Sequence, residues 1–141
     1  MEFKDILHII NKKNINYYLT NKSAKELYDT IFFNKKYKSK EINIITDSIN
    51  SPMILSDRFT LTQLGNSFQP YILSYKSYKI NIFVRFNGPI LHKYFTYKNK
   101  FNIEKFDALL RKDIINKKLY YVYKFHYFFN KNNLKLKNKT T

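Results

Sequence analysis

The strongest constraint on the fold of this chain is a run of nine residues, YKINIFVRF (78–86). One set of alternate positions holds Ile80, Ile82, Val84 and Phe86, and the other holds Lys79, Asn81, Phe83 and Arg85. Successive side chains of a strand point to opposite faces of a sheet, so this period of two predicts a strand with one face in a core. The chain is therefore expected to contain a sheet.

The segments around this strand predict an α+β domain over residues 42–129. In chain order we expect a strand at 42–46, a short helix within 53–64, strands at 71–77 and 78–86, a turn at 87–89, a strand at 91–98, a helix at 103–114 capped by Asn102, and a last strand at 119–129. With 71–77 and 78–86 counted as one arm of an extended middle hairpin, this order is that of a ferredoxin-like βαββαβ domain. Such a fold does not specify a function.

Residues 1–41 are expected to form a helical N-terminal extension that is separable from this domain. Apolar residues at helical spacing predict a helix over 3–13. Ser23 and Glu26 fit a capping box, which predicts that a second helix begins at Ser23 and ends near Phe33. The run KKYKSK (35–40) then forms a basic linker.

The last twelve residues, NKNNLKLKNKTT (130–141), form a basic tail. Their polarity predicts that the tail buries nothing and lies in solvent or on RNA.

The charge of the chain indicates a polyanionic partner. Lys and Arg number 26 against 10 Asp and Glu, which gives a net charge of +16 and an isoelectric point near 9.9. Self-repulsion of this size opposes a compact state unless a polyanion compensates it. A nucleic acid is the leading partner, and the surface of an anionic membrane is the second.

The amino-acid composition indicates what kind of genome encodes the chain. Lys, Asn, Ile, Tyr and Phe supply 83 of the 141 residues, and their codons are rich in A and T. This bias is typical of an organelle's or a reduced parasite's genome, and part of the lysine excess therefore reflects codon usage.

The basic residues are distributed unevenly along the chain. No Asp or Glu occurs between Asp57 and Glu104, and none follows Asp113. One-signed charge interleaved with Tyr and Phe suits phosphates and bases, whereas a solvated lysine face is the alternative explanation. The residues predicted to bind RNA are Lys76, Lys79, Arg85, His92, Lys93, Lys98, Lys100 and Lys124.

No arrangement of residues predicts catalysis, a metal site, a cofactor or a small-molecule substrate. The chain has no Cys, three scattered His and no Gly-rich phosphate loop. Glu104 and Asp107 fall in the first turn of the predicted helix, where they are expected to interact with the helix dipole. The longest apolar run is too short to span a bilayer, and we expect neither membrane insertion nor a targeting segment.

Four segments follow one another in an order and spacing found in a known family. LHKYFTYK (91–98) is similar to T-H-K-R-L-I-D-I, and FDAL (106–109), seven residues later, is similar to V-D-A-L. INIITDSINSP (42–52) and YILSYKSYK (71–79) are similar to I-x-I-x-x-x-S-F-D-H and Y-T-V-L-R-S-P-H-V. Together these segments resemble the small-subunit ribosomal protein ten family over residues 42–128.

This resemblance implies a non-catalytic function in translation. Members of the family bind ribosomal RNA and neighbouring proteins in the head of the small subunit. Taken together with the codon bias, the resemblance implies a component of a ribonucleoprotein that is encoded in the mitochondrion and located in the mitochondrial matrix. The chain departs from the family at Leu91, which replaces Thr, and at Lys76-Ser77-Tyr78, which replaces S-P-H.

Two other functions fit the composition. One is a basic RNA- or DNA-binding module outside the ribosome, and the other is a peripheral subunit of an organellar membrane complex. The first would bind nucleic acid alone in solution, and the second would bind anionic vesicles without RNA.

Overall fold

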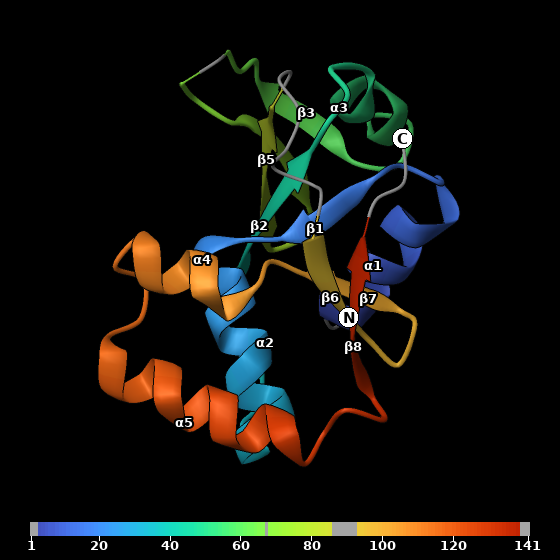
Figure 1. The fold of residues 1–141 in the computed structure, drawn as a ribbon. Coiled ribbons are helices and arrows are strands. Elements are labelled where there is room, and N and C mark those ends of the chain that lie inside the picture. The colour runs from blue at the N-terminus through green and yellow to red at the C-terminus, as the bar shows by residue number, and fades with distance from the viewer. Residues whose placement is uncertain (1–2, 67, 86–92, 139–141) are drawn as a thin grey trace.

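The computed structural model describes residues 3–66, 68–85 and 93–138 of the chain. It is an α+β fold in which helices pack on one large mixed sheet (Figure 1). The helices of the described residues are α1 (Phe3–Lys12), α2 (Asn21–Phe33), α3 (Asn50–Leu55), α4 (Phe106–Arg111) and α5 (Lys117–Phe128). The strands are β1 (Tyr17–Leu19), β2 (Glu41–Thr46), β3 (Thr60–Gln63), β4 (Tyr71–Tyr75), β5 (Tyr78–Val84), β6 (Lys93–Tyr97), β7 (Phe101–Ile103) and β8 (Leu134–Asn138).

The eight strands form one sheet in the order β3-β4-β5-β2-β1-β7-β6-β8. The pairs β2·β5 and β1·β7 are parallel, and the others are antiparallel. Two tight hairpins use left-handed residues, with Lys76 (φ 54°) between β4 and β5 and Lys98 and Asn99 (φ 53° and 58°) between β6 and β7. Two consecutive positive φ values are typical of a type I′ hairpin turn.

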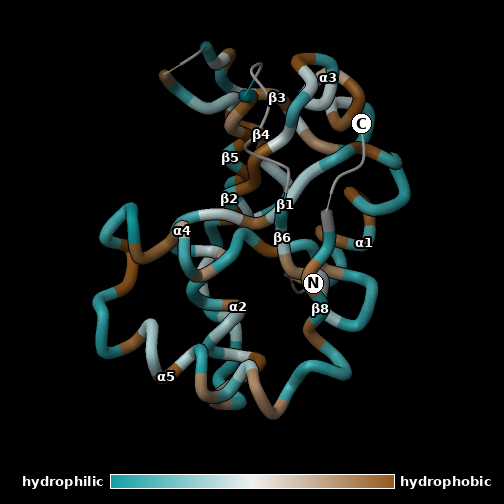
Figure 2. The backbone as a smooth tube through the Cα atoms, in the orientation of Figure 1, coloured by the Kyte–Doolittle hydropathy of each residue, from teal (hydrophilic) through white to brown (hydrophobic). Residues whose placement is uncertain are grey.

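The main core lies between the helices and one face of the sheet. Side chains from all five helices of the described residues contribute to it, together with alternate residues of the strands. In Figure 2 hydrophobic and hydrophilic colours alternate along the strands in the middle of the molecule, whereas the outer loops are mainly hydrophilic. A second, smaller cluster of Tyr18, Ile45, Phe83 and Tyr94 lies on the opposite face of the sheet.

Most of the predicted elements are confirmed. The alternating run forms β5, in which Ile80 and Ile82 are fully buried and Lys79 is exposed. The predicted strands at 42–46, 71–77 and 91–98 correspond to β2, β4 and β6. The predicted helices at 3–13, 23–33 and 103–114 correspond to α1, α2 and α4, although α4 is shorter at both ends. The predicted turn at 87–89 lies outside the described residues.

The predicted capping box at Ser23 is wrong. The helix α2 begins two residues earlier, at Asn21, so Ser23 is already helical. Its hydroxyl oxygen accepts a hydrogen bond from the backbone N–H of Asn43 (2.8 Å), which ties α2 to β2. The carboxylate of Glu26 binds a different segment, residues 38–39.

The prediction of a last strand at 119–129 is also wrong, because all of this segment up to Phe128 belongs to α5. Asn116 caps the helix, its side chain accepting a hydrogen bond from the Leu119 N–H (2.8 Å). Tyr120, Tyr123 and Tyr127 follow at helical spacing and all contact Phe106 of α4. Since almost every position of this segment is apolar, it satisfies a period of two and a helical period equally well.

Two more segments differ from the predictions. The predicted helical extension contains β1, which lies in the middle of the sheet between β2 and β7. The predicted solvated tail contains β8, which pairs with β6 and buries Leu134. The sheet is therefore larger than that of a βαββαβ domain, and a ferredoxin-like fold is not confirmed.

The 53–64 segment is a helix only at its start. The helix α3 ends at Leu55, and residues 60–63 form β3 at one edge of the sheet. Asn102 does not cap a helix, because it lies in β7 and donates its side-chain N–H to the Tyr17 carbonyl oxygen (3.1 Å).

Candidate nucleic-acid interface

A strongly basic hollow lies beside the loop that connects α2 to β2. Asn34 ends α2 in the left-handed region (φ 58°), and its N–H donates to the Thr30 carbonyl oxygen (3.1 Å). A left-handed residue at this position ends a helix and turns the chain away from its axis. The segment 35–40 therefore leaves α2 as a defined loop.

Tyr37 attaches this loop to the core. Its ring stacks on Phe3 of α1 at a centroid distance of 3.9 Å. Its hydroxyl donates to the Glu41 carbonyl oxygen (3.0 Å) and lies 3.1 Å from the hydroxyl oxygen of Ser23. Burial raises the pKa of Tyr37 well above its ordinary value, so the neutral phenol is retained.

Glu26 holds the second half of the loop. Its carboxylate accepts hydrogen bonds from the backbone N–H groups of Lys38 (3.1 Å) and Ser39 (3.4 Å). With Tyr37 directed inward, the neighbouring lysine side chains are exposed. The loop therefore presents its lysines from a fixed backbone.

The hollow beside the loop has a volume of about 560 Å³. It is lined by Phe3, Lys4, Thr30, Asn34, Lys35, Lys36, Tyr37, Lys38, Lys40 and Tyr78, that is, by five lysines and no acid. The Lys40 ammonium lies 4.5 Å from the centroid of the Tyr78 ring, so this lysine is oriented by a cation–π contact. The dipole at the C-terminus of α2 favours positive residues there, which explains the presence of Lys35 and Lys36 in part. It does not explain Lys4 and Lys40, because these lysines lie outside that helix end.

Two of the predicted RNA-binding residues lie close in the chain to Tyr78, which lines this hollow. Lys76 occupies the β4–β5 turn directly before Ser77 and Tyr78, and Lys79 follows Tyr78. The backbone N–H of Lys79 donates to the carbonyl oxygen of Lys40 (2.8 Å), which joins β5 to the loop. Alternation along β5 directs the Lys79 side chain to the opposite face of the sheet from Tyr78, where Glu41 of β2 is its register partner.

The other predicted residues are dispersed over the molecule. Lys98 and Lys100 are exposed at the β6–β7 turn, where the Lys100 carbonyl oxygen accepts from the Asn11 side chain of α1 (2.7 Å). Arg85 follows β5, with its guanidinium 5.6 Å from the centroid of the Phe83 ring. Lys93 begins β6, Lys124 is exposed on α5, and His92 lies outside the described residues.

The consecutive strands β5 and β6 are separated in the sheet by β2, β1 and β7. This separation explains why the predicted residues of the two strands do not form one patch.

Sequence reasoning missed Lys4, Lys35, Lys36, Lys38 and Lys40, which line the hollow. A signal was present, because KKYKSK places four lysines within six residues. The sequence alone did not single out these lysines, because residues 1–41 contain both basic and acidic residues. Only the fold shows that the lysines line a hollow without an acid.

Two acids, Glu104 and Asp29, bind partners inside the structure, whereas Asp5 and Glu41 near the hollow are exposed. Glu104 is 3% exposed and binds the Lys112 ammonium (2.7 Å) and the Thr20 hydroxyl (2.8 Å). Asp29 binds the Lys25 ammonium (2.9 Å) and accepts from the Tyr123 hydroxyl (2.6 Å). Glu104 therefore does not act on the dipole of α4 as predicted, because it lies before that helix and bridges β7, β1 and Lys112.

Within the ranges that the structure describes, no three His, Asp or Glu side chains come together as a metal site would require. Over the same ranges, no helix combines the length and the apolarity needed to cross a bilayer. Comparison of the chain with protein-family models, with curated proteins and with solved structures finds no match.

Proposed function

We propose that this protein is a structural, RNA-binding component of a ribonucleoprotein particle. The observation that carries the proposal is the hollow lined by five lysines and no acid. Lysine ammonium groups neutralise phosphates as point charges and release condensed counterions, which gives affinity without reading a base sequence. Of the three aromatic residues in the lining, Phe3 and Tyr78 are buried, so the half-buried Tyr37 is the one that offers a contact to sugars or bases.

The small subunit of a mitochondrial ribosome is the particle that we propose. The four segments that resemble ribosomal protein ten support this choice, together with the codon bias toward A and T. In this function the protein would contact ribosomal RNA and neighbouring proteins of the head, and it would catalyse no reaction. A basic module that binds RNA or DNA outside the ribosome is supported by the same lysines, so the two proposals must be separated by the particle in which the protein is found.

Fractionation of a lysate tests which particle contains the protein. The tagged protein should co-sediment with small ribosomal subunits on a sucrose gradient, and ribonuclease should release it from those fractions. Sedimentation as a free protein that still binds RNA would support the non-ribosomal module. Absence of the protein from every RNA-containing fraction, before as well as after ribonuclease treatment, would contradict both.

Substitution of lysines in the loop tests whether the hollow binds RNA. We expect Lys35→Gln, Lys36→Gln and Lys38→Gln together to weaken binding to a labelled stem-loop RNA, measured by filter retention. Each lost phosphate contact lowers the slope of log affinity against log salt by about 0.7 to 0.9, so the triple variant should lose about 2 from this slope.

The matched control replaces three exposed lysines that do not line the hollow, Lys12→Gln, Lys22→Gln and Lys118→Gln. This variant has the same net charge as the loop variant and should keep most of the salt slope. Equal losses in the two variants would show that only the total charge matters, and the hollow would not be the binding site.

A further inference from the structure

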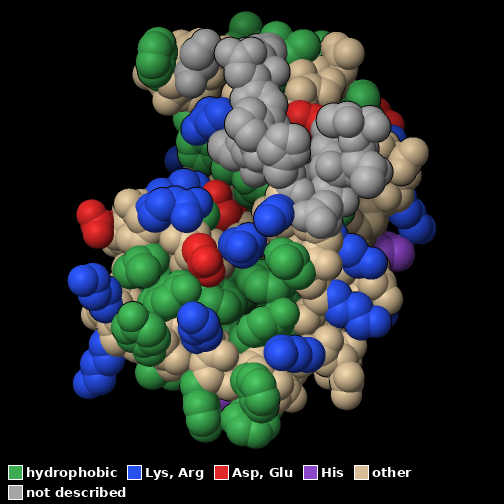
Figure 3. Space-filling view, viewed as in Figure 1, with side chains coloured by type: hydrophobic (Ala, Val, Ile, Leu, Met, Phe, Trp, Pro, Cys, Tyr) green, Lys and Arg blue, Asp and Glu red, His purple; other side chains and the backbone are tan. Residues whose placement is uncertain are grey.

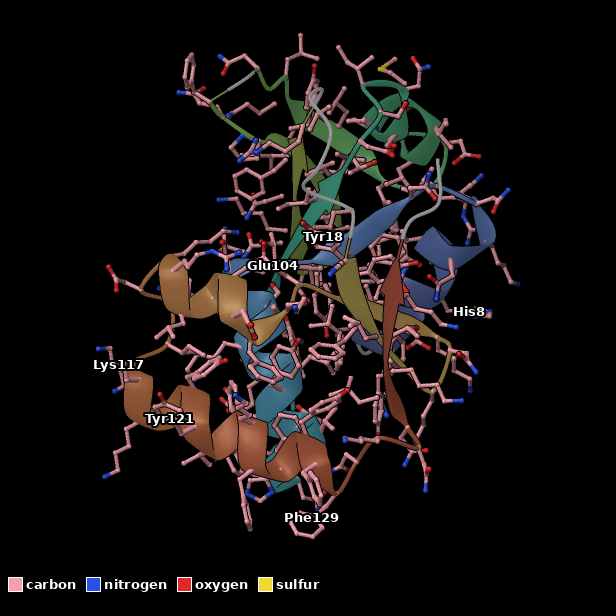
Figure 4. All side chains as sticks on the ribbon, viewed as in Figure 1. His8, Tyr18, Glu104, Lys117, Tyr121 and Phe129 are labelled. Carbon is pink, nitrogen blue, oxygen red and sulfur yellow. The ribbon has the colours of Figure 1, made fainter. Side chains whose placement is uncertain are left out.

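The outer face of α5 carries an aromatic surface that no other element of the described chain covers. Tyr121, Phe125, Phe128 and the following Phe129 are 64%, 63%, 66% and 69% exposed. Tyr121 and Phe129 project away from the body of the protein in Figure 4, and hydrophobic side chains gather over this region in Figure 3. We refer to these four residues as the α5 aromatic face.

The aromatic face cannot turn into the core, because the opposite side of α5 is already packed there. Tyr123 is fully buried and its hydroxyl donates to the Asp29 carboxylate of α2 (2.6 Å). The ring of His126 packs against Phe32 and Phe33 of α2, at centroid distances of 5.8 Å and 5.1 Å. The helix is therefore held in one orientation, with apolar rings on both sides.

The three Phe rings of the aromatic face form one surface. Phe129 lies 5.2 Å from Phe125 and 5.5 Å from Phe128 between ring centroids. Single exposed apolar residues are ordinary in soluble proteins, but contiguous exposed aromatic rings mark interaction surfaces. Phe125, Phe128 and Phe129 offer no hydrogen-bonding group, so their partner must be apolar where it meets them.

The charges around the face restrict the partner further. Lys117, Lys118 and Lys124 lie on α5, and Lys131 follows it. The Lys131 ammonium lies 4.8 Å from the centroid of the Phe128 ring. No Asp or Glu occurs in the sequence after Asp113, so α5 has only positive side chains beside its rings. The partner must therefore combine an apolar interior with negative charge at its surface.

We propose that the α5 aromatic face docks the protein on the surface of an anionic lipid bilayer. The Phe rings enter the boundary between headgroups and acyl chains, the Tyr121 hydroxyl stays at the headgroups, and the lysine ammonium groups bind the lipid phosphates. Helices that lie in the plane of a membrane interface combine these residue types in this way. Nucleic acid fits this face less well, because a convex helix crowded with mutually packed Phe rings provides no slot for splayed bases.

Vesicle binding by the full chain tests this inference. We expect the wild-type protein to float with vesicles of phosphatidylcholine and phosphatidylglycerol and to stay free when the vesicles are phosphatidylcholine alone. Phe125→Gln, Phe128→Gln and Phe129→Gln together should lower the partition onto the anionic vesicles at least about tenfold, because each ring removed takes away apolar burial. The control variant carries Met53→Gln, Leu64→Gln and Phe68→Gln, which are equally exposed apolar residues elsewhere, and it should bind as the wild type does.

A fluorescent reporter gives a second measurement that does not depend on losing a ring. The chain contains no Trp, so Phe129→Trp introduces a single reporter, and Phe68→Trp introduces one at the 93% exposed control position. We expect anionic vesicles to shift the emission of the Trp at position 129 to the blue, and brominated lipid to quench it. The Trp at position 68 should show neither change.

Three outcomes would overturn the inference. One is unchanged vesicle binding by the triple Phe variant with no spectral shift at position 129. Another is a loss of RNA binding in that variant without vesicle binding in the wild type, which would assign the face to nucleic acid. The third is a wild-type dimer that the triple variant dissociates, since this would assign the face to a second copy of the chain.

Discussion

At the scale of single residues, Glu104 shows how the fold changes the role of an acid. Glu104 lies two residues before α4. Its carboxylate binds the Lys112 ammonium through both oxygens (2.9 and 2.7 Å) and the Thr20 hydroxyl through one (2.8 Å). A buried carboxylate needs such partners, because removing it from water is costly. Glu104 thus joins β7 to the start of α2 instead of serving a helix dipole.

Removing the partner of Glu104 should destabilise the protein. We expect Lys112→Met to lower the free energy of unfolding by about 2–3 kcal/mol, somewhat below the usual 3–5 kcal/mol for breaking a buried pair. The reduction reflects the 36% exposure of the Lys112 side chain, which lets water reach the carboxylate. Urea unfolding followed by circular dichroism measures the change.

The control for this variant is Lys105→Met, which removes the same charge from a lysine that forms no ion pair among the described residues. It should change the free energy of unfolding by less than about 0.5 kcal/mol, as surface substitutions usually do. If the two variants were equally stable, Glu104 would not depend on Lys112.

At the scale of elements, β8 shows how pairing can order a polar segment. The sequence LKLKN alternates, but only Leu134 is fully buried, and Leu136 is 45% exposed. The strand is ordered by hydrogen bonding to β6 along its whole length, from the Lys93·Asn138 pair to the Tyr97·Leu134 pair. Its lysines also protect this edge of the sheet from pairing with another chain.

The two leucines of β8 provide an internal comparison. We expect Leu134→Ala to lower the free energy of unfolding by about 2–4 kcal/mol, because it opens a cavity in the core. Leu136→Ala should cost less than about 1 kcal/mol, since nearly half of this side chain is already in water. Equal small effects in thermal or urea unfolding would mean that the tail is a solvated arm.

At the scale of the whole molecule, the fold separates its acids from much of its basic surface. Glu26, Asp29 and Glu104 bind backbone N–H groups, a tyrosine and lysines inside the structure. The hollow has five lysines and no acid in its lining, and the segment from α5 to Lys131 carries four lysines and no acid of its own. A net charge of +16 is thereby concentrated on particular surfaces, which favours polyanionic partners.

The tyrosines of the core predict loss of stability in alkaline solution. Burial raises the pKa of Tyr17, Tyr18, Tyr28, Tyr37 and Tyr123 well above the ordinary value near 10, with nearby carboxylates as a further cause for Tyr28 and Tyr123. A pKa that is raised in the folded state contributes stability below the unfolded pKa, and this contribution is lost as pH rises toward the folded value. The free energy of unfolding should therefore fall steadily above about pH 10.

A titration that records phenolate absorbance and circular dichroism together measures this effect. We expect the last tyrosines to ionise only as the secondary structure is lost, in one cooperative step. Ionisation of all 13 tyrosines near pH 10 with an unchanged circular dichroism spectrum would contradict the burial of these rings.

The candidate interface could be predicted only in part from the sequence. The charge of the chain and the exposure of Lys76 and Lys79 followed from composition and alternation. The hollow could not be predicted, because it joins Lys4 of α1 to the loop after α2 and to Tyr78 of β5. The eight predicted residues are also not one surface, because consecutive strands need not be neighbours in a sheet.

The sequence by itself determined the elements whose apolar residues follow one clear period, namely β2, β4, β5, β6, α1, α2 and most of α4. Only the tertiary structure decided that 119–127 is a helix, since aromatic residues at nearly every position satisfy both periods. It also decided that β1 and β8 are strands, because three residues or a lysine-rich run become a strand only when a distant partner supplies the hydrogen bonds. The periodicity of apolar side chains can be read directly from the sequence, whereas pairing between distant segments depends on how the whole chain packs.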